Sequence, residues 1–594
     1  MVRRPGPWIQ DAAMTENSRT KSNDTDHHDG DRRRMIAASL GLAALSIANA
    51  NAETPIAGGQ SSNDPAGEDD AITPAVIAGA ERLAGIRFTP AERETIAETV
   101  GEQVSLFATR VRAGEMPNSL APAMVFRAML PDRSRSAATP AGDPDRIVGT
   151  FGPLPDDDRD IAFASIAALA TWMRRDGLTS ERITRIYLDR LERLAPELRC
   201  MVTIAADRAL GQARAADAEL REGRDRGPLH GIPYGVKDII DVEGLPATWG
   251  AEPFRDRVAT TTAKVVERLD AAGAVMLGKT SVGALAYGDL WFGGRTLNPW
   301  DRNQGSSGSS AGSASGTAAG LMAFALGTET LGSIVSPCIR CGTTGLRPTF
   351  GRVPKSGVMS LCWSLDKIGP ICRQVGDTAL VLAAINGGDR EDPSSVEEPF
   401  TYDGEQGVRG LRVGWNPAWF KDASEVERDV VRHLEASGCE LVEIELPDLP
   451  YESLLVTLYS EAAAAFESLT RSNDDDSLSW QDPEAWPNTF RRSWFIPAVE
   501  AVQSDRVRRE VMEAMADVMT TVDVLVTPPY AANLLLITNA TGHPSLVQPV
   551  GFDEDAHPRG ITVIGRLFDE GTLCRIGRCI EDRYGITDRR PPVE

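Results

Sequence analysis

The sequence alternates between amphipathic stretches, with an apolar residue every three or four positions, and short apolar runs that end at glycine or a turn. The stretch "AKVVERLDAAGAVMLGKTS" contains both, since a helical pattern stops at Gly273 and a strand-like run follows from Ala274 to Leu277. Further strands are expected at "MVTI", "LRVGW", "CELVEIEL", "VDVLVTP" and "ITVIG", which begin at residues 201, 411, 439, 522 and 561. Repeated helix-then-strand units predict an α/β fold, with a central mixed β-sheet covered by helices on both faces.

The charge balance limits the kind of partner. The chain has 594 residues, with 62 Lys and Arg against 85 Asp and Glu, which gives a net charge of −23. Such a negative field opposes binding to nucleic acid or to an anionic membrane surface, and favours a small-molecule substrate. Eight cysteines are too few for a disulfide scaffold, and the close pair Cys338 and Cys341 has no second pair or histidine to complete a metal site. We therefore expect ordinary buried thiols and no metal.

The first 52 residues have the layout of an export signal. Three arginines, Arg32 to Arg34, precede an apolar run that is too short to span a membrane permanently, and small residues follow as Ala48-x-Ala50 and Ala50-x-Ala52. Adjacent arginines before such a run are typical of the twin-arginine route. Residues 1–52 are therefore predicted to direct a periplasmic or secreted location, without stable membrane insertion after signal removal. The alternative is a helix that stays with the protein.

Composition divides the rest of the chain into three parts. Residues 53–72 are polar and rich in Gly, Pro and Asp, which predicts a disordered tether. Residues 73–140 predict a small N-terminal helical appendage, with Pro90 just inside a helix start and Gly114 at a helix stop. After another stretch rich in Asp and Pro, residues 147–594 are expected to form the main domain.

One stretch has the composition of a linker but not the position of one. Gly305 to Gly320, "GSSGSSAGSASGTAAG", consists almost wholly of residue types that usually form flexible coils. It runs directly into "LMAFALGTETLGSIVSPC", an apolar run typical of a buried strand, which ends in a second small-residue turn holding Ser333. Since a linker should be followed by a domain boundary, the position favours a functional loop.

Reactive side chains occur in three segments: the strand-like run that ends at Lys237, the loop with Ser309 and Ser310, and the turn with Ser333. A serine hydroxyl is a weak nucleophile without a base such as histidine or lysine, and histidines are scarce here. Two other serine-hydrolase patterns also occur. "GSSAG" matches the nucleophile elbow G-x-S-x-G with Ser310 at its centre, although no strand precedes it, and "SLDK" from Ser364 matches S-x-x-K without a later Lys-Thr-Gly element.

From about Asp158 to Pro592 the chain resembles the amidase signature hydrolases. The family's lysine segment is similar to "GPLHGIPYGVKDIIDVEGLPATWG", its loop to "NPWDRNQGSSGSSAGSASGTAAG", and its nucleophile segment to "LGTETLGSIVSPCIRCGTTGLRPTFGRVP". The resemblance implies the family's fold over residues 147–594, a Ser-cisSer-Lys triad, and no cofactor. Residue by residue, Ser333 matches the nucleophile, Ser309 the bridging serine after a cis peptide bond, and Lys237 the lysine base.

The resemblance also implies an oxyanion hole made by the backbone N–H groups of Thr330, Leu331, Gly332 and Ser333. In the family's usual G-T-D-T-G-G-S-I-R, Leu331 of this chain replaces a glycine, and Val335 replaces the arginine. Leucine keeps its N–H but resists positive φ and adds a side chain, so we expect a narrower pocket. The missing guanidinium predicts a less rigid turn.

These features predict an exported amidohydrolase that cleaves a carboxamide to a carboxylate and an amine or ammonia. One alternative is an amidotransferase A-type subunit, which shares the fold but works with partner subunits on charged transfer RNA in the cytoplasm. Another is a catalytically degenerate binding protein. Asp238, Asp366 and Lys279 are interpreted as structural, and the insert from Ser472 to Phe495 is a candidate pocket wall. Neither the amide substrate nor the oligomeric state follows from the sequence.

Overall fold

The computed structural model describes residues 72–593 apart from 113, 115, 132–144, 148 and 588. The predicted leader, residues 1–52, and the predicted tether up to residue 71 lie outside the described residues. No helix in the described part of the chain is long and apolar enough to cross a membrane. The export signal and the domain boundaries therefore stay predictions.

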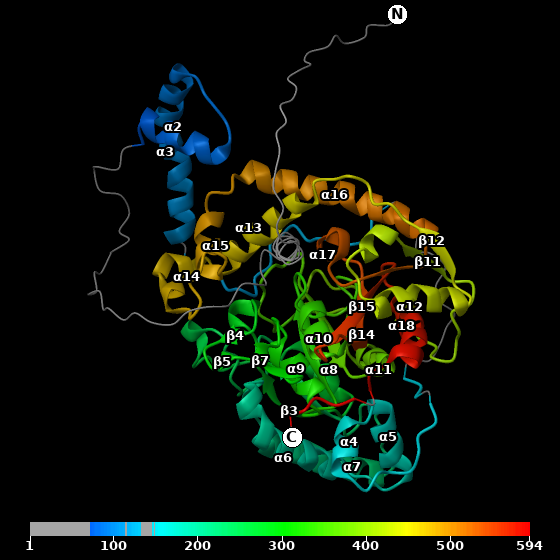
Figure 1. The fold of residues 1–594 in the computed structure, drawn as a ribbon. Coiled ribbons are helices and arrows are strands. Elements are labelled where there is room, and N and C mark those ends of the chain that lie inside the picture. The colour runs from blue at the N-terminus through cyan, green and yellow to red at the C-terminus, as the bar shows by residue number, and fades with distance from the viewer. Residues whose placement is uncertain are drawn as a thin grey trace, which may run out of the picture.

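An 11-stranded sheet runs through the centre of the molecule (Figure 1). Its strands in spatial order are β1 (Met201–Ile204), β3 (Val275–Thr280), β2 (Pro233–Lys237), β8 (Phe324–Glu329), β10 (Lys367–Cys372), β9 (Thr344–Arg347), β14 (Ser545–Phe552), β15 (Pro558–Gly565), β13 (Val524–Thr527), β11 (Arg412–Trp415) and β12 (Glu440–Glu443). The strands β3, β2 and β8 run parallel, as do β13, β11 and β12, and the other neighbours pair antiparallel. The predicted mixed sheet is confirmed, and each expected strand is present.

Helices cover both faces of this sheet, and α16 lies across one end of the molecule (Figure 1). The main-domain helices are α4 (Asp158–Phe163), α5 (Ile166–Arg175), α6 (Ser180–Leu198), α7 (Ala206–Arg221), α8 (Lys264–Ala271), α9 (Ala311–Ala318), α10 (Val335–Cys341), α11 (Val375–Ile385), α12 (Glu425–Ala436), α13 (Leu455–Ala465), α14 (Glu467–Ser472), α15 (Trp486–Ser493), α16 (Ala498–Thr521), α17 (Leu534–Thr541) and α18 (Glu570–Tyr584). Two short ribbons lie outside the large sheet: β4 (Leu290–Trp291) with β5 (Gly294–Arg295), and β6 (Leu297–Asn298) with β7 (Asp301–Gly305).

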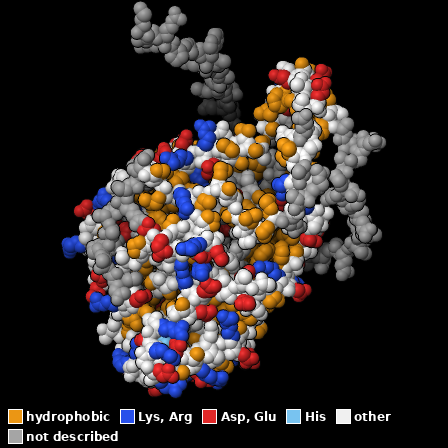
Figure 2. All heavy atoms as spheres, turned by 180° about the vertical axis from the view of Figure 1, so that it is seen from behind, with side chains coloured by type: hydrophobic (Ala, Val, Ile, Leu, Met, Phe, Trp, Pro, Cys, Tyr) orange, Lys and Arg blue, Asp and Glu red, His pale blue; other side chains and the backbone are white. Residues whose placement is uncertain are grey.

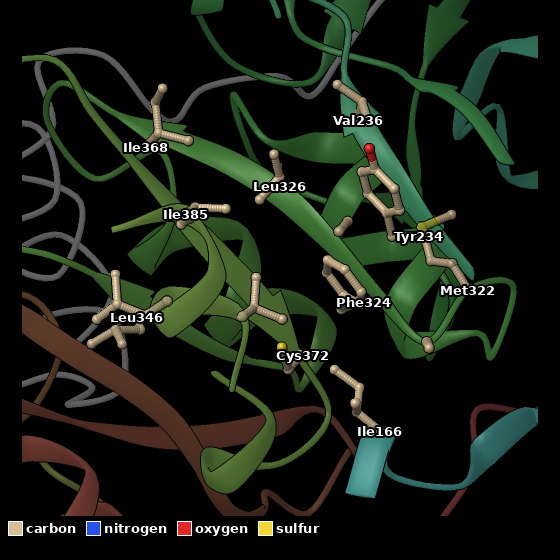
Figure 3. Packing of buried hydrophobic residues seen from close by; sticks show 14 of the residues in the cluster. Ile166, Tyr234, Val236, Met322, Phe324, Leu326, Leu346, Ile368, Cys372 and Ile385 are labelled. Atoms are coloured by element: carbon tan, nitrogen blue, oxygen red, sulfur yellow. The ribbon is translucent and has the colours of Figure 1, made fainter. Parts of the chain in front are cut away.

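The core fixes β2 against β8. Both strands are buried at every residue, and their sequences are mainly apolar before the polar residues at their carboxyl ends, Lys237, Thr328 and Glu329. Tyr234 on β2 stacks on Phe324 at the start of β8, with ring centroids 5.1 Å apart, and Val236 and Leu326 lie further along the same two strands (Figure 3). Because the two strands are parallel, this packing holds their carboxyl ends side by side.

The N-terminal appendage begins with a helical hairpin of α2 (Pro74–Ala84) and α3 (Pro90–Arg112). Glu81 and Arg93 form an ion pair between the two helices. The hairpin projects from the body in Figure 1, and Figure 2 shows hydrophobic side chains along it; Leu106 and Phe107 of α3 are exposed.

Residues 116–131, the later part of the predicted helical appendage, contain no helix; they contain only turns, bends and irregular backbone. Pro117 and Pro122 interrupt the helical pattern, since proline lacks the backbone N–H that a helix needs. The segment packs on the main domain instead. Asn118 exchanges two hydrogen bonds with the backbone of Ser360, and Phe126 packs edge-on against Phe350.

Candidate active site

The predicted site residues meet at one edge of the sheet. Lys237 is the last residue of β2, and the turn that contains Ser333 follows directly after β8. Because β2 and β8 are parallel neighbours, their carboxyl ends open at the same edge, where ligands of open α/β sheets usually bind. The fold therefore brings together two segments that are far apart in the sequence.

Lys237 is fully buried, and its ammonium group is surrounded by hydroxyl groups. The Nζ atom lies 2.8 Å from Oγ of Ser309, 3.1 Å from Oγ of Ser310 and 2.7 Å from Oγ1 of Thr328. Burial lowers the pKa of Lys237 to about 7, although the negative charges of Asp366 and Glu329 oppose the change. A lysine with such a pKa is largely neutral in mildly alkaline solution and can accept a proton.

The two serines beside Lys237 differ in their remaining contacts. The Ser310 hydroxyl donates to the Thr328 carbonyl (3.1 Å) and accepts from the Thr328 N–H (3.1 Å), so its proton is already engaged. No such backbone partner holds the Ser309 hydroxyl among the described residues. Ser309 is thus the serine whose proton is free to move, as expected of a bridging group.

Close backbone packing explains the small residues of this loop. The Gly308–Ser309 peptide bond is cis, the geometry that the family resemblance implies for the bridging serine. A Cβ atom on Gly308 would lie 1.8 Å from the Gly288 carbonyl oxygen, so no larger residue fits. The helix α9, which follows the loop, is buried at all of its positions. The flexible-linker interpretation of residues 305–320 is therefore wrong.

The turn after β8 presents unpaired backbone donors. The described residues provide no acceptor for the N–H groups of Leu331, Gly332 and Ser333. The backbone is left-handed at Gly332, with φ of 87°, and not at Leu331, so the leucine does not have to adopt the positive φ that it resists. Thr330 is anchored through its hydroxyl, which donates to Asp366 (2.6 Å). The turn thus offers free donors in the form that an oxyanion hole requires.

Glu329 has a role that the sequence patterns did not indicate, although it stands where the family motif has aspartate. Its carboxylate is fully buried, and one oxygen accepts from the N–H groups of Ile334 and Val335, both at 2.9 Å. The other oxygen accepts from Arg347 (2.6 Å) and Asn539 (2.9 Å). These donors hold the pKa of Glu329 down at about 2 in spite of its burial. Glu329 thus anchors the backbone of the turn at Val335, and the expected loss of rigidity stays a prediction.

We expect Glu329→Gln to lower kcat by about tenfold or more, because an amide NH₂ group would face donors on one side and weaken an anchor of the nucleophile turn. Steady-state kinetics of amide cleavage measure the loss of kcat, and thermal unfolding measures any loss of stability. Glu570→Gln is the matched control, since Glu570 is an equally buried partner of an arginine, Arg352, and its other contact is the Thr349 N–H. The control should lose stability but keep its kcat. Equal kcat losses in both variants would contradict a positioning role for Glu329.

A pocket opens directly beside Ser333. It encloses about 470 Å³ of empty space, its open mouth included, and its lining contains Ser333 together with the free donors of the turn. Ser333 is 9% exposed, whereas Lys237 and Ser309 are 0% and 1% exposed, so Ser333 is the member of the trio that reaches the pocket. The Ser310 N–H donates to the Ser333 carbonyl (3.2 Å) and ties the loop to the turn. A larger cavity of about 910 Å³, beneath residues 119–126, contains none of these three side chains.

The two competing serine patterns do not form sites. Ser310 is fully buried, and β7, the strand nearest before it, ends at Gly305, so the elbow geometry is absent. In the S-x-x-K pattern, the Ser364 hydroxyl donates to Glu461, while the Lys367 ammonium contacts the Leu365 carbonyl.

The residues interpreted as structural have partners that fit this role. Asp238 pairs with Lys279 (3.0 Å) and accepts from the Thr248 N–H (2.9 Å), and both members of the pair are fully buried. Asp366 accepts from two further N–H groups, those of Leu361 and Cys362. Within the described ranges, no group of three or more His, Cys, Asp or Glu side chains is arranged to hold a metal ion.

The fold and this site define a class: α/β proteins with a lysine–serine centre, in which histidine takes no part. Comparison with known proteins narrows it, since a family model described as Amidase matches residues 182–574. The A subunit of the glutamyl-tRNA(Gln) amidotransferase from Chloroflexus aggregans is 33% identical over 486 residues, which cover 73% of this chain and 99% of that one. The chain belongs to the amidase family, the amidase signature enzymes.

Solved structures agree with this assignment. The peptide amidase of Stenotrophomonas maltophilia matches with a TM-score of 0.64 and 29% identity, over 72% of this chain and 98% of that one. A second solved structure contains a chain of a vestigial protein complex that reveals the evolutionary origins of an s-triazine catabolic enzyme. That chain matches with a TM-score of 0.66 and 26% identity, over 70% of this chain and 98% of that one. Family membership makes the protein a C–N hydrolase or an amidotransferase.

Proposed function

We propose that this protein is an amidohydrolase that cleaves a carboxamide C–N bond through a serine acyl-enzyme. Ser333 is the nucleophile, Ser309 the bridging serine and Lys237 the base. The observation that carries the proposal is the buried hydrogen bond from Lys237 to Ser309 (2.8 Å), next to a pocket that Ser333 lines. The low pKa of Lys237 supports it, because only the neutral amine can take a proton.

In the proposed reaction, the neutral amine of Lys237 takes the proton of Ser309 as Ser309 takes the proton of Ser333. The Ser333 oxygen attacks the amide carbonyl, and the free N–H groups of the turn stabilise the oxyanion. The C–N bond then breaks, and the proton returns through Ser309 to the leaving nitrogen. Water attacks the acyl-enzyme next, loses its proton along the same path, and releases the carboxylate and Ser333.

The second candidate function is that of an amidotransferase A-type subunit. It is favoured by the curated relatives, which are named as the A subunits of glutamyl-tRNA(Gln) amidotransferases and match over nearly their whole length. Both candidates share the cleavage of an amide C–N bond, and they differ in whether partner subunits are needed. The comparisons favour this candidate over the exported hydrolase; the net charge of −23 favours a small-molecule substrate over transfer RNA.

One experiment separates the two functions. The chain is purified without any partner and assayed for release of ammonia or amine from simple carboxamides, and for hydroxamate formation with hydroxylamine. A hydrolase turns over alone and forms the hydroxamate from its acyl-enzyme. Turnover that appears only when partner subunits are present would favour the amidotransferase. Absence of any covalent adduct with a serine-directed phosphonate would favour the degenerate binding protein.

The exported location is a separate proposal, which rests on residues 1–52 alone. We expect protein isolated from its host to begin near Glu53, because small residues in the signal pattern precede that position. Terminal sequencing of the protein from the periplasm or medium measures this. An intact leader on protein recovered from the cytoplasm would contradict export.

A further inference from the structure

The pocket beside Ser333 is uncharged. Of the described residues that line it, none is an acid, a base or a histidine. Its larger side chains are those of Tyr287, Leu331, Leu361, Leu458 and Trp486, and the remaining lining residues are small or carry a hydroxyl group. An ammonium or carboxylate group placed here would lose water without gaining a counter-charge, which is strongly unfavourable.

Two charged groups close to the pocket are already paired. The small cavity behind the pocket is lined by Lys355 and Asp366 among others. The Lys355 ammonium donates to Ser394 (2.6 Å), and Asp366 accepts from Thr330 and two backbone N–H groups. These groups are therefore poorly placed to pair with a charged substrate.

One wall of the pocket is an ordered group of aromatic rings. The ring of Tyr287 packs against Trp480 and Trp486, with centroids 4.8 Å and 5.2 Å away. Trp486 stacks on Phe490, with centroids 5.0 Å apart and ring planes 9° apart. The indole N–H of Trp486 donates to the Leu285 carbonyl (3.0 Å), which fixes the ring. The insert from Ser472 to Phe495 thus supplies part of the wall, and an aromatic substituent fits such a surface well.

Tyr287 also carries an unused polar group. Its side chain is 6% exposed, and among the described residues its hydroxyl has no hydrogen-bond partner. Burial raises the pKa of Tyr287, so the hydroxyl keeps its proton. Tyr287 therefore adds an aromatic ring and no charge to the pocket wall.

We propose that the substrates are uncharged carboxamides that carry an aromatic group, which packs on Tyr287 and Trp486 while the amide lies at Ser333. The inference rests on the proposed function and names its substrate class.

A matched series of amides tests this on the unaltered protein. We expect kcat/KM to be about tenfold or more higher for 4-methylbenzamide than for acetamide. The same difference is expected between 4-methylbenzamide and 4-carbamoylbenzoate, an anion of similar shape. Glutamine, an amide with two charges, should be equally poor. Equal rates for the neutral and charged aromatic amides, or for 4-methylbenzamide and acetamide, would overturn the inference.

Inhibitors give a second readout that requires no variant. Boronic acids bind reversibly to serine nucleophiles, so phenylboronic acid should inhibit about tenfold more strongly than methylboronic acid or 4-carboxyphenylboronic acid. If p-nitrophenyl acetate acylates Ser333 but neither series shows the preference, the inference fails and the proposed function stands. If no ester or amide acylates the protein, both fail.

A pair of variants locates the preference. Trp486→Leu should lower the ratio of kcat/KM for 4-methylbenzamide to kcat/KM for acetamide by about fivefold or more. The substitution removes an aromatic ring from the pocket and keeps an apolar side chain. Phe490→Leu is the matched control, since Phe490 stacks on Trp486 and does not line the pocket. Equal ratios in the two variants would contradict the role of Trp486.

Discussion

Ser333→Ala is expected to lower kcat by about 10⁴-fold or more, because it removes the atom that attacks the carbonyl while the rest of the site persists. The measurements are amide turnover and intact-mass detection of a covalent adduct with an activated ester or phosphonate. Neither turnover nor an adduct should be found. The fold should be unaffected, because the alanine loses only a hydroxyl that faces the pocket.

Ser310→Ala is the comparison that gives this result its meaning. Ser310 lies in the same loop and contacts the same lysine, but its proton is engaged by the Thr328 carbonyl. We expect a much smaller loss of kcat, arising from looser positioning of Lys237. Near-normal turnover in Ser333→Ala would refute the nucleophile assignment, whereas a collapse confined to Ser310→Ala would support the elbow pattern.

The pH profile of the unaltered enzyme is expected to report Lys237. Burial lowers the pKa of this lysine to about 7, and its neutral form is the active base. Well below pH 7 the neutral fraction rises tenfold with each pH unit, so kcat/KM should rise likewise and level off above about pH 7. Lys237→Ala should lower kcat by about 10²–10⁴-fold and abolish this inflection.

The buried lysine Lys279 provides the control for the profile. It pairs with Asp238 and donates to the Pro246 carbonyl, so it already has partners of its own. A Lys279→Met variant, measured at a temperature where it stays folded, should keep the inflection near pH 7. A flat profile in the unaltered enzyme, or an inflection that survives Lys237→Ala, would rule out the proposed base.

The parts of the site that lie in sequence motifs could be predicted. Lys237 ends an apolar run, and Ser309 and Ser333 stand at small-residue turns, so each has a local signal. Glu329 also has a local signal, because it replaces the aspartate of the family motif. Its partner Arg347, however, lies on a different strand, and no local pattern connects the two. Pattern reasoning identifies residues one segment at a time and does not show which segments pair.

The pocket wall could not be predicted for the same reason. Tyr287 and Trp486 are far apart in the chain and meet only because α15 packs beside the loop that follows β3. Residues 116–131 illustrate the opposite failure. Their apolar residues resemble a helical pattern, but two prolines and the contacts of Asn118 with Ser360 favour an extended path.

The close packing around residues 305–320 has a consequence for how the protein tolerates mutation. A Cβ atom on Gly308 would overlap the Gly288 carbonyl, and one on Gly312 would lie 2.1 Å from the Cys200 carbonyl oxygen. Substitutions that a real linker accepts freely are therefore excluded here by neighbouring backbone, which cannot move aside as a side chain can. In a saturation-mutagenesis survey, the stretch with the plainest composition in the chain would be among its least variable.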